Sequence, residues 1–190
     1  MLNVSPSGVF KEKLGAFFSF VFGPDMKCVP PFWCDYDLGI LTIDETADEV
    51  AKFRNCDVAE AKANMLQAIA LQEEVAPTVE LIKELKAKGY KLYVLSNMSK
   101  EYIEYLRKLS VFDYFDYQVV SCEIHLGKPN PKIYEYLLSH CGLTASETIF
   151  IDDRKDNVEV AEQVGITPFH FDRRNPEKAC DELRKVIYND

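Results

Sequence analysis

Two adjacent carboxylates, Asp152 and Asp153, directly follow an apolar run of strand length. Two earlier apolar runs are also followed by polar residues: Ser96 and Asn97 come after the first, and Lys128 lies in the loop after the second. Paired carboxylates suit Mg²⁺, a hard cation that prefers oxygen ligands. Hydroxyl and ammonium groups bind phosphate oxygens. Together these residue types indicate phosphoryl transfer, in which catalysis is mostly positioning and charge neutralisation.

Taken singly, each of these residues has an ordinary structural explanation. A carboxylate pair after a strand is often a helix N-cap, because aspartate is favoured there. A serine, or a lysine before proline, is common in turns. The functional interpretation therefore rests on the whole set, whose members follow consecutive apolar segments in the same way.

The elements that must position these residues appear as alternating patterns after residue 75. Strands are predicted at 90–95, 117–121, 148–152 and 167–171, and helices at 77–88, 100–109, 131–141, 157–164 and 176–188. Apolar strands separated by such helices indicate an α/β fold with a parallel sheet and helices on both faces. Ligands of such sheets bind outside the carboxyl ends of the strands. The polar residues are therefore expected to converge on one edge of the sheet.

The chain before residue 75 has a helical pattern instead. Helices are expected at 9–22, at 43–54 and from Asp57 onward, with a turn-rich linker that contains three prolines at 23–39. Asp57 with Glu60 has the spacing of a helix N-terminus. We therefore expect a small α-helical cap at 9–74 and a core at 75–190.

Three stretches resemble motifs of the haloacid dehalogenase-like (HAD) hydrolase superfamily. "LYVLSN" resembles the second motif, "GKPNPKIYEYLL" the third and "IFIDDRKDNVEVAEQVG" the fourth, between about Val75 and Phe171. The resemblance implies a Rossmann-like core that depends on Mg²⁺ and cleaves small-molecule phosphate esters through an aspartyl-phosphate. By the same resemblance, Ser96 and Asn97 would bind the phosphate, and Lys128 would steady both phosphate and nucleophile.

The fourth motif implies the metal site. Asp152 would hold Mg²⁺, and Asp153 would assist as a second acid close to the metal. Lys128 and Asp153 are thus the residues expected to take part in catalysis. Asn157 would fix the loop and the helix that follows it.

The first motif of the superfamily is D-x-D on a central strand near the N-terminus, and it supplies the nucleophile. No apolar strand that ends in D-x-D precedes residue 20. Asp35 and Asp37 in "CDYDLGILT" have the matching spelling and are the nucleophile candidates. Adjacent prolines precede them, and proline cannot donate to a central strand ladder. Thr42 with Glu45 has the spacing of a capping box, so the stretch is more typical of a helical cap.

This departure leaves two functions open: an active phosphatase, or a truncated or non-catalytic protein that still binds phosphate and Mg²⁺. Loss of the central strand would leave a slot in the sheet with backbone groups that are costly to bury unpaired. We expect a rearranged N-terminal segment, another chain in the slot, or low stability. A response-regulator domain is disfavoured, because its acid pair precedes the hydroxyl and the lysine. A dinucleotide oxidoreductase is disfavoured, because no G-x-G-x-x-G follows a strand.

Composition narrows the possible partners. The 190 residues carry a net charge of −9, from 31 acids against 22 bases, which argues against nucleic acid or an anionic membrane as the main partner. The apolar run 14–23 is too short to span a bilayer. Six cysteines show no C-x-x-C pair, as expected of free thiols in a reducing cytoplasm. The expected partner is a small phosphate ester, and the sequence is compatible with a monomer or an oligomer.

Overall fold

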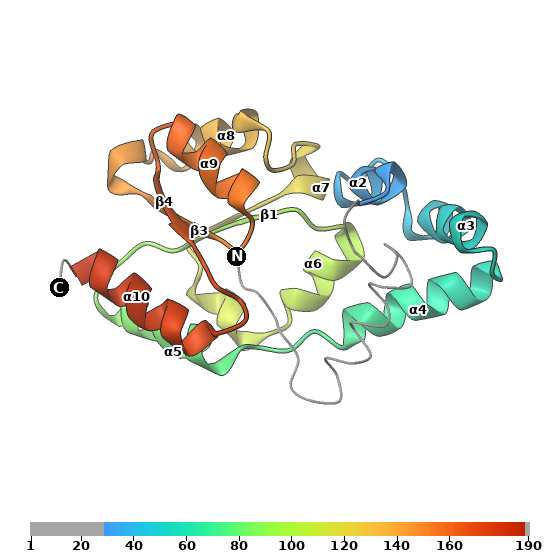
Figure 1. Cartoon of the computed structure of the whole chain (residues 1–190), viewed down its shortest axis with the longest axis horizontal. Coiled ribbons are helices and arrows are strands. Elements are labelled where there is room, and N and C mark those ends of the chain that lie inside the picture. Colours follow the sequence, from blue (N-terminus) through green and yellow to red (C-terminus); the bar gives the residue numbers. More distant parts are fainter. Residues whose placement is uncertain (1–28, 189–190) are drawn as a thin grey trace.

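The computed structural model describes residues 29–188, and Figure 1 shows their arrangement. The N-terminal elements are α2 (Pro31–Asp37), α3 (Ile43–Arg54), α4 (Val58–Ala70) and α5 (Ala76–Ala87). The middle elements are β1 (Tyr93–Ser96), α6 (Lys100–Leu106), the 3-10 helix η1 (Ser110–Tyr114), β2 (Tyr117–Val120), α7 (Ser121–Ile124) and α8 (Pro131–Cys141). The C-terminal elements are the 3-10 helix η2 (Ala145–Glu147), β3 (Ile149–Asp152), α9 (Lys155–Gln163), β4 (Thr167–His170) and α10 (Pro176–Tyr188).

Helices α2, α3 and α4, called the cap helices below, pack around a hydrophobic cluster of their own that includes Trp33 and Tyr36. Helix α3 begins with a complete capping box. Glu45 N donates to Thr42 Oγ1 over 3.3 Å, and Thr42 N donates to Glu45 Oε2 over 2.8 Å. These bonds satisfy amides that have no partner within the helix, and the predicted bounds 43–54 are confirmed.

The predicted linker at 23–39 is wrong in its second half, because α2 lies within it. Pro31 is the first residue of this helix, where its missing N–H costs nothing and its fixed φ suits the helix. The helix ends at Asp37, and Gly39 takes a left-handed conformation with φ +69°. The predicted helix 9–22 lies outside the described residues.

The four strands form two parallel pairs. β1 pairs with β2 from Tyr93↔Tyr117 to Ser96↔Val120, and β3 pairs with β4 from Ile149↔Thr167 to Asp152↔His170. Within residues 29–188 no ladder joins one pair to the other. The expected slot for a central strand stays a prediction.

Helices cover both faces of the strands, as predicted (Figure 1). On one face, α8 and α9 pack on Leu95, Val119 and Phe150. On the other face, α5 and α10 form a cluster through Leu81, Leu85 and Leu183, with the partly buried Ile149, Ile151 and Phe169 against it. The side chains of a buried parallel strand pack on both of its faces, which explains why these strands are almost continuously apolar.

Most boundaries differ from prediction by a few residues. Helices α8 and α10 have the predicted bounds. The first strand starts at Tyr93, because Leu92 N bonds the side chain of Asp116 and not a neighbouring strand. The helix that starts at Lys100 ends at Leu106 rather than 109, and η1 follows it.

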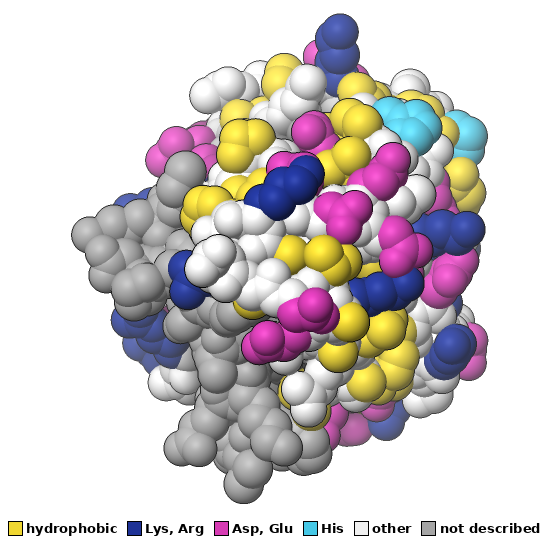
Figure 2. Space-filling model, turned by 90° about the vertical axis from the view of Figure 1, so that its right-hand side faces the viewer, with side chains coloured by type: hydrophobic (Ala, Val, Ile, Leu, Met, Phe, Trp, Pro, Cys, Tyr) yellow, Lys and Arg dark blue, Asp and Glu magenta, His cyan; other side chains and the backbone are white. Residues whose placement is uncertain are grey.

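Figure 2 views the end of the molecule at which the cap helices lie. Acidic, basic and apolar side chains alternate on this face, and exposed apolar residues of the cap helices and their loops include Ile40, Phe53, Val58 and Leu66. No helix of the described chain is long and apolar enough to cross a membrane. The cysteines at 34, 56, 122, 141 and 180 form no disulfide.

Candidate active site

Lys128 and Asp152 form a buried ion pair at the carboxyl ends of β1 and β3. Lys128 Nζ lies 2.7 Å from Asp152 Oδ2 and donates a second bond, of 2.8 Å, to the carbonyl oxygen of Leu95. Both charged side chains have 0% exposure. An ammonium has three N–H donors. These two bonds leave one donor for a phosphate oxygen or another carboxylate.

Burial and the ion pair shift the two pKa values in ways that follow from their contacts. Burial lowers the pKa of Lys128, and the Asp152 carboxylate offsets this effect only in part. Burial alone raises the pKa of Asp152, but the charge and hydrogen bond of Lys128 hold that pKa below its usual range. A buried ion pair adds little net stability, since desolvation offsets the attraction. Its place at the strand ends therefore points to function.

Asn97 contacts this lysine, and Ser96 precedes Asn97 as the last residue of β1. Asn97 Nδ2 donates to the carbonyl oxygen of Lys128, and the Lys128 N–H donates to Asn97 Oδ1, both over 2.8 Å. Asn97 thus holds the backbone of Lys128 in place, and phosphate binding by Asn97 stays a prediction. The Ser96 hydroxyl is buried and has no hydrogen-bond partner in the described chain. Because buried hydroxyls nearly always have a partner, Ser96 suits a phosphate oxygen.

Asn157 orients the second oxygen of Asp152. Asp152 Oδ1 accepts hydrogen bonds from Arg154 N (2.9 Å) and from Asn157 Nδ2 (3.0 Å). The role predicted for Asn157 at this loop agrees with this contact. The other end of the amide, Asn157 Oδ1, is buried and has no partner among residues 29–188. This oxygen is therefore available as a hydrogen-bond acceptor or a metal ligand on an amide that contacts Asp152.

The side-chain oxygens of Asp152, Asp153 and Asn157 are of the kind that a magnesium ion binds. No cluster of three or more His, Cys, Asp or Glu side chains suited to a metal occurs in the described part of the chain. Mg²⁺ needs no such cluster, because one or two carboxylates commonly bind it together with water and substrate phosphate. Asp152 and Asp153 supply that number, and the orphaned Asn157 Oδ1 adds a neutral oxygen nearby.

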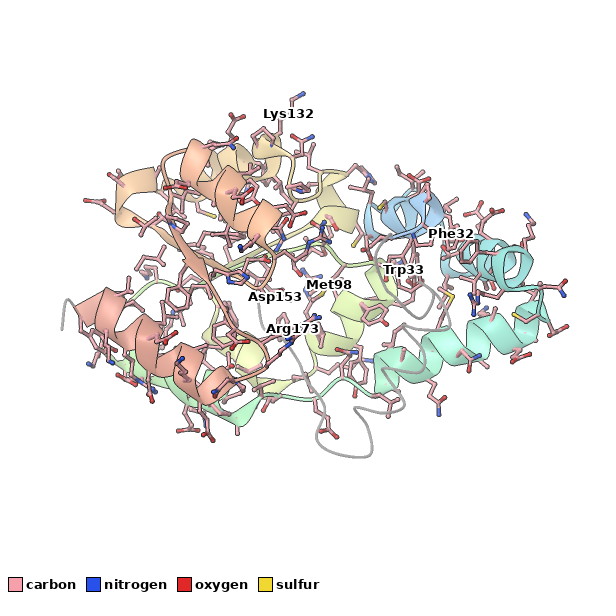
Figure 3. All side chains as sticks on the ribbon, viewed as in Figure 1. Phe32, Trp33, Met98, Lys132, Asp153 and Arg173 are labelled. Carbon is pink, nitrogen blue, oxygen red and sulfur yellow. The ribbon has the colours of Figure 1, made fainter. Side chains whose placement is uncertain are left out.

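Two residues at the carboxyl end of β4, missed by the sequence reasoning, contact Asp153. His170 Nε2 lies 3.0 Å from the carbonyl oxygen of Asp153, and Arg173 Nη1 lies 3.3 Å from its Oδ2. In Figure 3, Asp153 and Arg173 face the same central region as Met98. The signal that could have found His170 and Arg173 is the rule used for the other strands: both lie at or just after a strand end.

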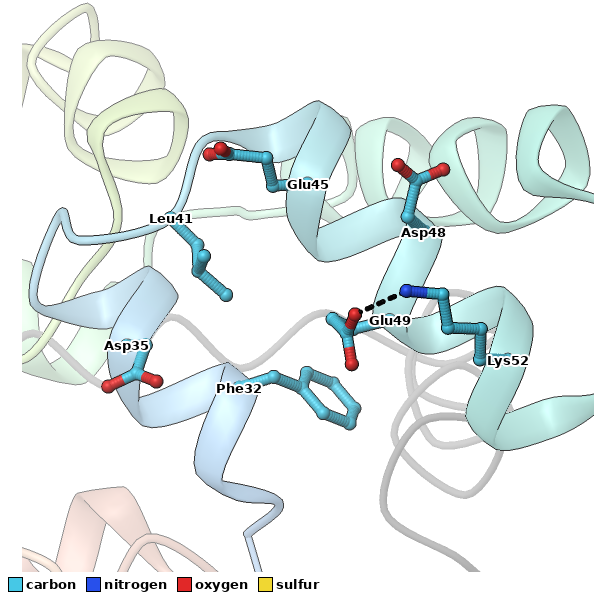
Figure 4. A pocket seen from close by; sticks show the side chains of 7 residues that line it. All are labelled: Phe32, Asp35, Leu41, Glu45, Asp48, Glu49 and Lys52. Atoms are coloured by element: carbon cyan, nitrogen blue, oxygen red, sulfur yellow. Dashed lines mark hydrogen bonds and ion pairs between the residues drawn. The ribbon is translucent and has the colours of Figure 1, made fainter.

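The nucleophile candidates Asp35 and Asp37 lie on α2, in the cap, and not on a strand. Asp35 lines a cavity of about 400 Å³ together with side chains of α3 (Figure 4). Asp37 is the last residue of α2. It lies beside Ser99, which belongs to the loop after β1. Burial raises the pKa of Asp37 to about 7, although the Ser99 N–H favours the ionised form. In the described chain, the carboxylate that contacts Lys128 is that of Asp152.

The order and geometry of these residues agree with a known family. A model of the haloacid dehalogenase-like hydrolases matches residues 32–165. The chain belongs to the haloacid dehalogenase-like hydrolase family. The match includes the strands that carry Ser96 and Asp152 and the loop that carries Lys128, so the resemblance seen in the sequence motifs is confirmed.

Similar proteins have been characterised. A sesquiterpene phosphatase of Aspergillus oryzae is 27% identical over 82% of this chain and 79% of its own length. A glyceraldehyde 3-phosphate phosphatase of Methanocaldococcus jannaschii is 34% identical over 52% of this chain and 44% of its own length. A solved HAD family enzyme of Bacteroides thetaiotaomicron, in complex with magnesium and inorganic phosphate, has a TM-score of 0.67 at 22% identity. That match covers 84% of this chain and 85% of the other, and it supports the Rossmann-like α/β fold with a helical cap.

Proposed function

We propose that this protein is a Mg²⁺-dependent phosphatase that acts on small phosphate esters. The observation that carries the proposal is the buried Lys128–Asp152 pair, whose ammonium bonds the carbonyl oxygen of Leu95, the residue before Ser96 with its unpartnered hydroxyl. An ammonium with a donor to spare and a hydroxyl without a partner form a binding site for phosphate oxygens. Two relatives named as phosphatases support the same reaction class.

The residues of this chain divide the work as follows. Lys128 and Ser96 bind and orient the phosphate, and Asn97 keeps Lys128 in register with the end of β1. Asp152 and Asp153 would hold Mg²⁺. When the metal is bound, it would neutralise negative charge on the phosphate oxygens.

Two candidate functions differ in whether the protein has a group that attacks the phosphate. An aspartyl-phosphate mechanism requires a second carboxylate at Lys128, for which Asp35 and Asp37 are the sequence candidates. The other candidate is a protein that binds phosphate and Mg²⁺ without hydrolysis. It is favoured by the finding that, among the described residues, Lys128 pairs with Asp152 and with no second carboxylate.

Hydrolysis of p-nitrophenyl phosphate by the 190-residue protein, with Mg²⁺ and with a chelator, tests the proposal. We expect turnover that requires Mg²⁺ and falls by about 100-fold or more in Asp152→Asn, because charge stabilisation of this kind is worth that factor. Asp48→Asn is the matched control, since Asp48 is a carboxylate on the cap helix α3. It should leave turnover unchanged.

Calorimetric titration with inorganic phosphate separates the two candidates if there is no turnover. Phosphate binding that is lost in Ser96→Ala would support the non-catalytic protein. Folded protein that neither binds phosphate nor hydrolyses the ester would rule out both functions.

A further inference from the structure

The segment that runs from the end of β3 into α9 carries three carboxylates, and each of them faces a cationic side chain. The three ion pairs, with their N–O distances, are Asp152–Lys128 (2.7 Å), Asp153–Arg173 (3.3 Å) and Asp156–Arg154 (2.6 Å). The protein thus balances the negative charge of this segment with its own cations. A metal ion that binds at the segment meets carboxylates that already have a counter-ion.

The three pairs differ in how easily they open. The pair of Lys128 is fully buried on both sides, so neither partner can turn away into water. Arg154 and Asp156 are two residues apart and share two hydrogen bonds, of 2.6 and 3.1 Å. Arg173 makes a single contact with Asp153, over 3.3 Å. Because single, exposed ion pairs are weak, this is the pair that a metal ion can open at the lowest cost.

The two members of this pair have different exposure. The side chain of Asp153 is 11% exposed, whereas that of Arg173 is 60% exposed. Within residues 29–188, the bond from Arg173 is the one hydrogen bond that the Asp153 carboxylate accepts. A carboxylate that is largely withdrawn from water needs a counter-charge. Arg173 supplies this charge from a side chain that can turn into the solvent.

The end of β4 holds the backbone of both acids in place. Phe171 N donates to the carbonyl oxygen of Asp152 over 2.9 Å, and His170 Nε2 lies 3.0 Å from the carbonyl oxygen of Asp153. Arg173 follows two residues after Phe171, and its side chain lies beside the carboxylate of Asp153 (Figure 3). The carboxylate therefore has a fixed position, and the guanidinium is the part of the pair that can move.

We infer that Arg173 is a counter-ion of Asp153 that competes with Mg²⁺ for this carboxylate and is displaced when the ion binds. The inference rests on the proposed function, in which Asp152 and Asp153 hold the metal. A guanidinium keeps its charge at any physiological pH, and it repels a divalent cation at the same carboxylate. Arg173 therefore weakens the binding of Mg²⁺ and raises the concentration of the ion at which the site fills.

Calorimetric titration with Mg²⁺ alone, without a phosphate ester, tests the inference. Arg173→Gln removes the charge and should bind Mg²⁺ about two- to fivefold more tightly than the wild-type chain, because an exposed ion pair contributes a factor of that size. Arg173→Lys keeps the charge and should return the affinity toward the wild-type value. Arg174→Gln is the matched control. It removes the same charge one residue away, and the bond that Arg174 donates, to Asp172, comes from its backbone N–H.

Ionic strength gives a readout that a purely structural role of Arg173 would not change. The titrations are repeated from about 0.1 M to about 1 M salt, a range over which the screening length falls from about 10 Å to about 3 Å. The difference in affinity between the wild-type chain and Arg173→Gln should shrink over this range. The affinity of Arg174→Gln should stay close to that of the wild-type chain at each salt concentration.

Equal affinities of the wild-type chain and Arg173→Gln would overturn the inference, and so would equal changes in Arg173→Gln and Arg174→Gln. Weaker binding in Arg173→Gln would also overturn it, because Arg173 would then help to build the metal site. Turnover that requires Mg²⁺, together with equal affinities, would overturn this inference alone and leave the proposed function standing. Tighter binding in Arg173→Gln without turnover would support the inference and count against hydrolysis. Absence of Mg²⁺ binding from every variant would overturn both.

Discussion

The ion pairs at the strand ends and those among the cap helices are built from the same residue types but in opposite surroundings. In the core, Lys128 and Asp152 have no exposed side-chain surface and come from segments 24 residues apart. In the cap, Lys52 pairs with Glu49 one helical turn away, and their side chains are 71% and 42% exposed (Figure 4). Water screens the cap pair, so its energy is small. An ion pair therefore indicates a functional site mainly where folding has buried it away from water.

The acidic lining of the cap cavity illustrates the same contrast. Asp35 shares the cavity with carboxylates of α3, whose residues at 45, 48 and 49 lie on one side of a surface helix. No buried, unpartnered polar atom lies among them. The cavity thus has the composition of a solvated helix face, whereas the site at the strand ends has two orphaned atoms, Ser96 Oγ and Asn157 Oδ1.

Removal of the buried ammonium of Lys128 should have the largest effect on stability. Lys128→Met should lower the free energy of unfolding by about 3–5 kcal/mol, because Asp152 would remain as a buried charge without its partner. Urea unfolding at pH 7 measures the effect. Lys52→Met, in the exposed pair, is the control and should cause no measurable change. Equal effects of the two substitutions would contradict the distinction between buried and exposed pairs.

The joint between the cap and the core should be nearly as sensitive. A Cβ on Gly39 would lie 2.6 Å from the carbonyl oxygen of Cys122 on α7, in a backbone with φ +69°. Gly39→Ala should therefore cost about 3 kcal/mol, from left-handed strain together with overpacking. Gly89→Ala is a matched control, because Gly89 has φ +85° and nothing within 4 Å of its Cβ position. It should cost about 1–2 kcal/mol, and a cost equal to that of Gly39→Ala would show that contact with Cys122 is unimportant.

The carboxyl of Asp37 should make stability depend on pH. Its pKa is about 7 in the folded protein against 3.8 for the ordinary group. The folded state thus holds the proton more tightly, and stability from this group falls as pH rises from about 4 to 7. The slope is at most about 1.4 kcal/mol per pH unit. Asp37→Asn should flatten the curve of unfolding free energy over this range, and parallel curves for the two proteins would refute the prediction.

Loss of the capping box at the N-terminus of α3 should give the smallest of the four effects. Thr42→Ala removes the hydroxyl that accepts from Glu45 N and should cost about 1 kcal/mol. Glu45→Gln keeps an oxygen acceptor for the Thr42 N–H and should cost less. Thermal unfolding of the three proteins measures both losses. A larger loss in Glu45→Gln would mean that charge, and not hydrogen bonding, stabilises this helix start.

Local features were predictable from the sequence. The start of α3 follows from the Thr42–Glu45 spacing, and the bounds of α8 follow from Asn130, Pro131 and Gly142. Asn130 Oδ1 accepts from Lys132 N, and Gly142 has φ +63°, so both ends are set by residues within one turn. The short helix α2 was missed because the pair of prolines at its start, Pro30 and Pro31, resembles a turn.

The sequence by itself determined which chemical groups this protein has and, through strand order, that Ser96, Lys128 and Asp152 meet at one edge. Tertiary structure decided what each group contacts. It turned the Asn97 amide onto Lys128, brought Arg173 to Asp153 and placed Asp37 of the cap beside Ser99. The physical reason is range: periodicity and caps act over a few residues, whereas contacts between distant residues depend on how the elements pack.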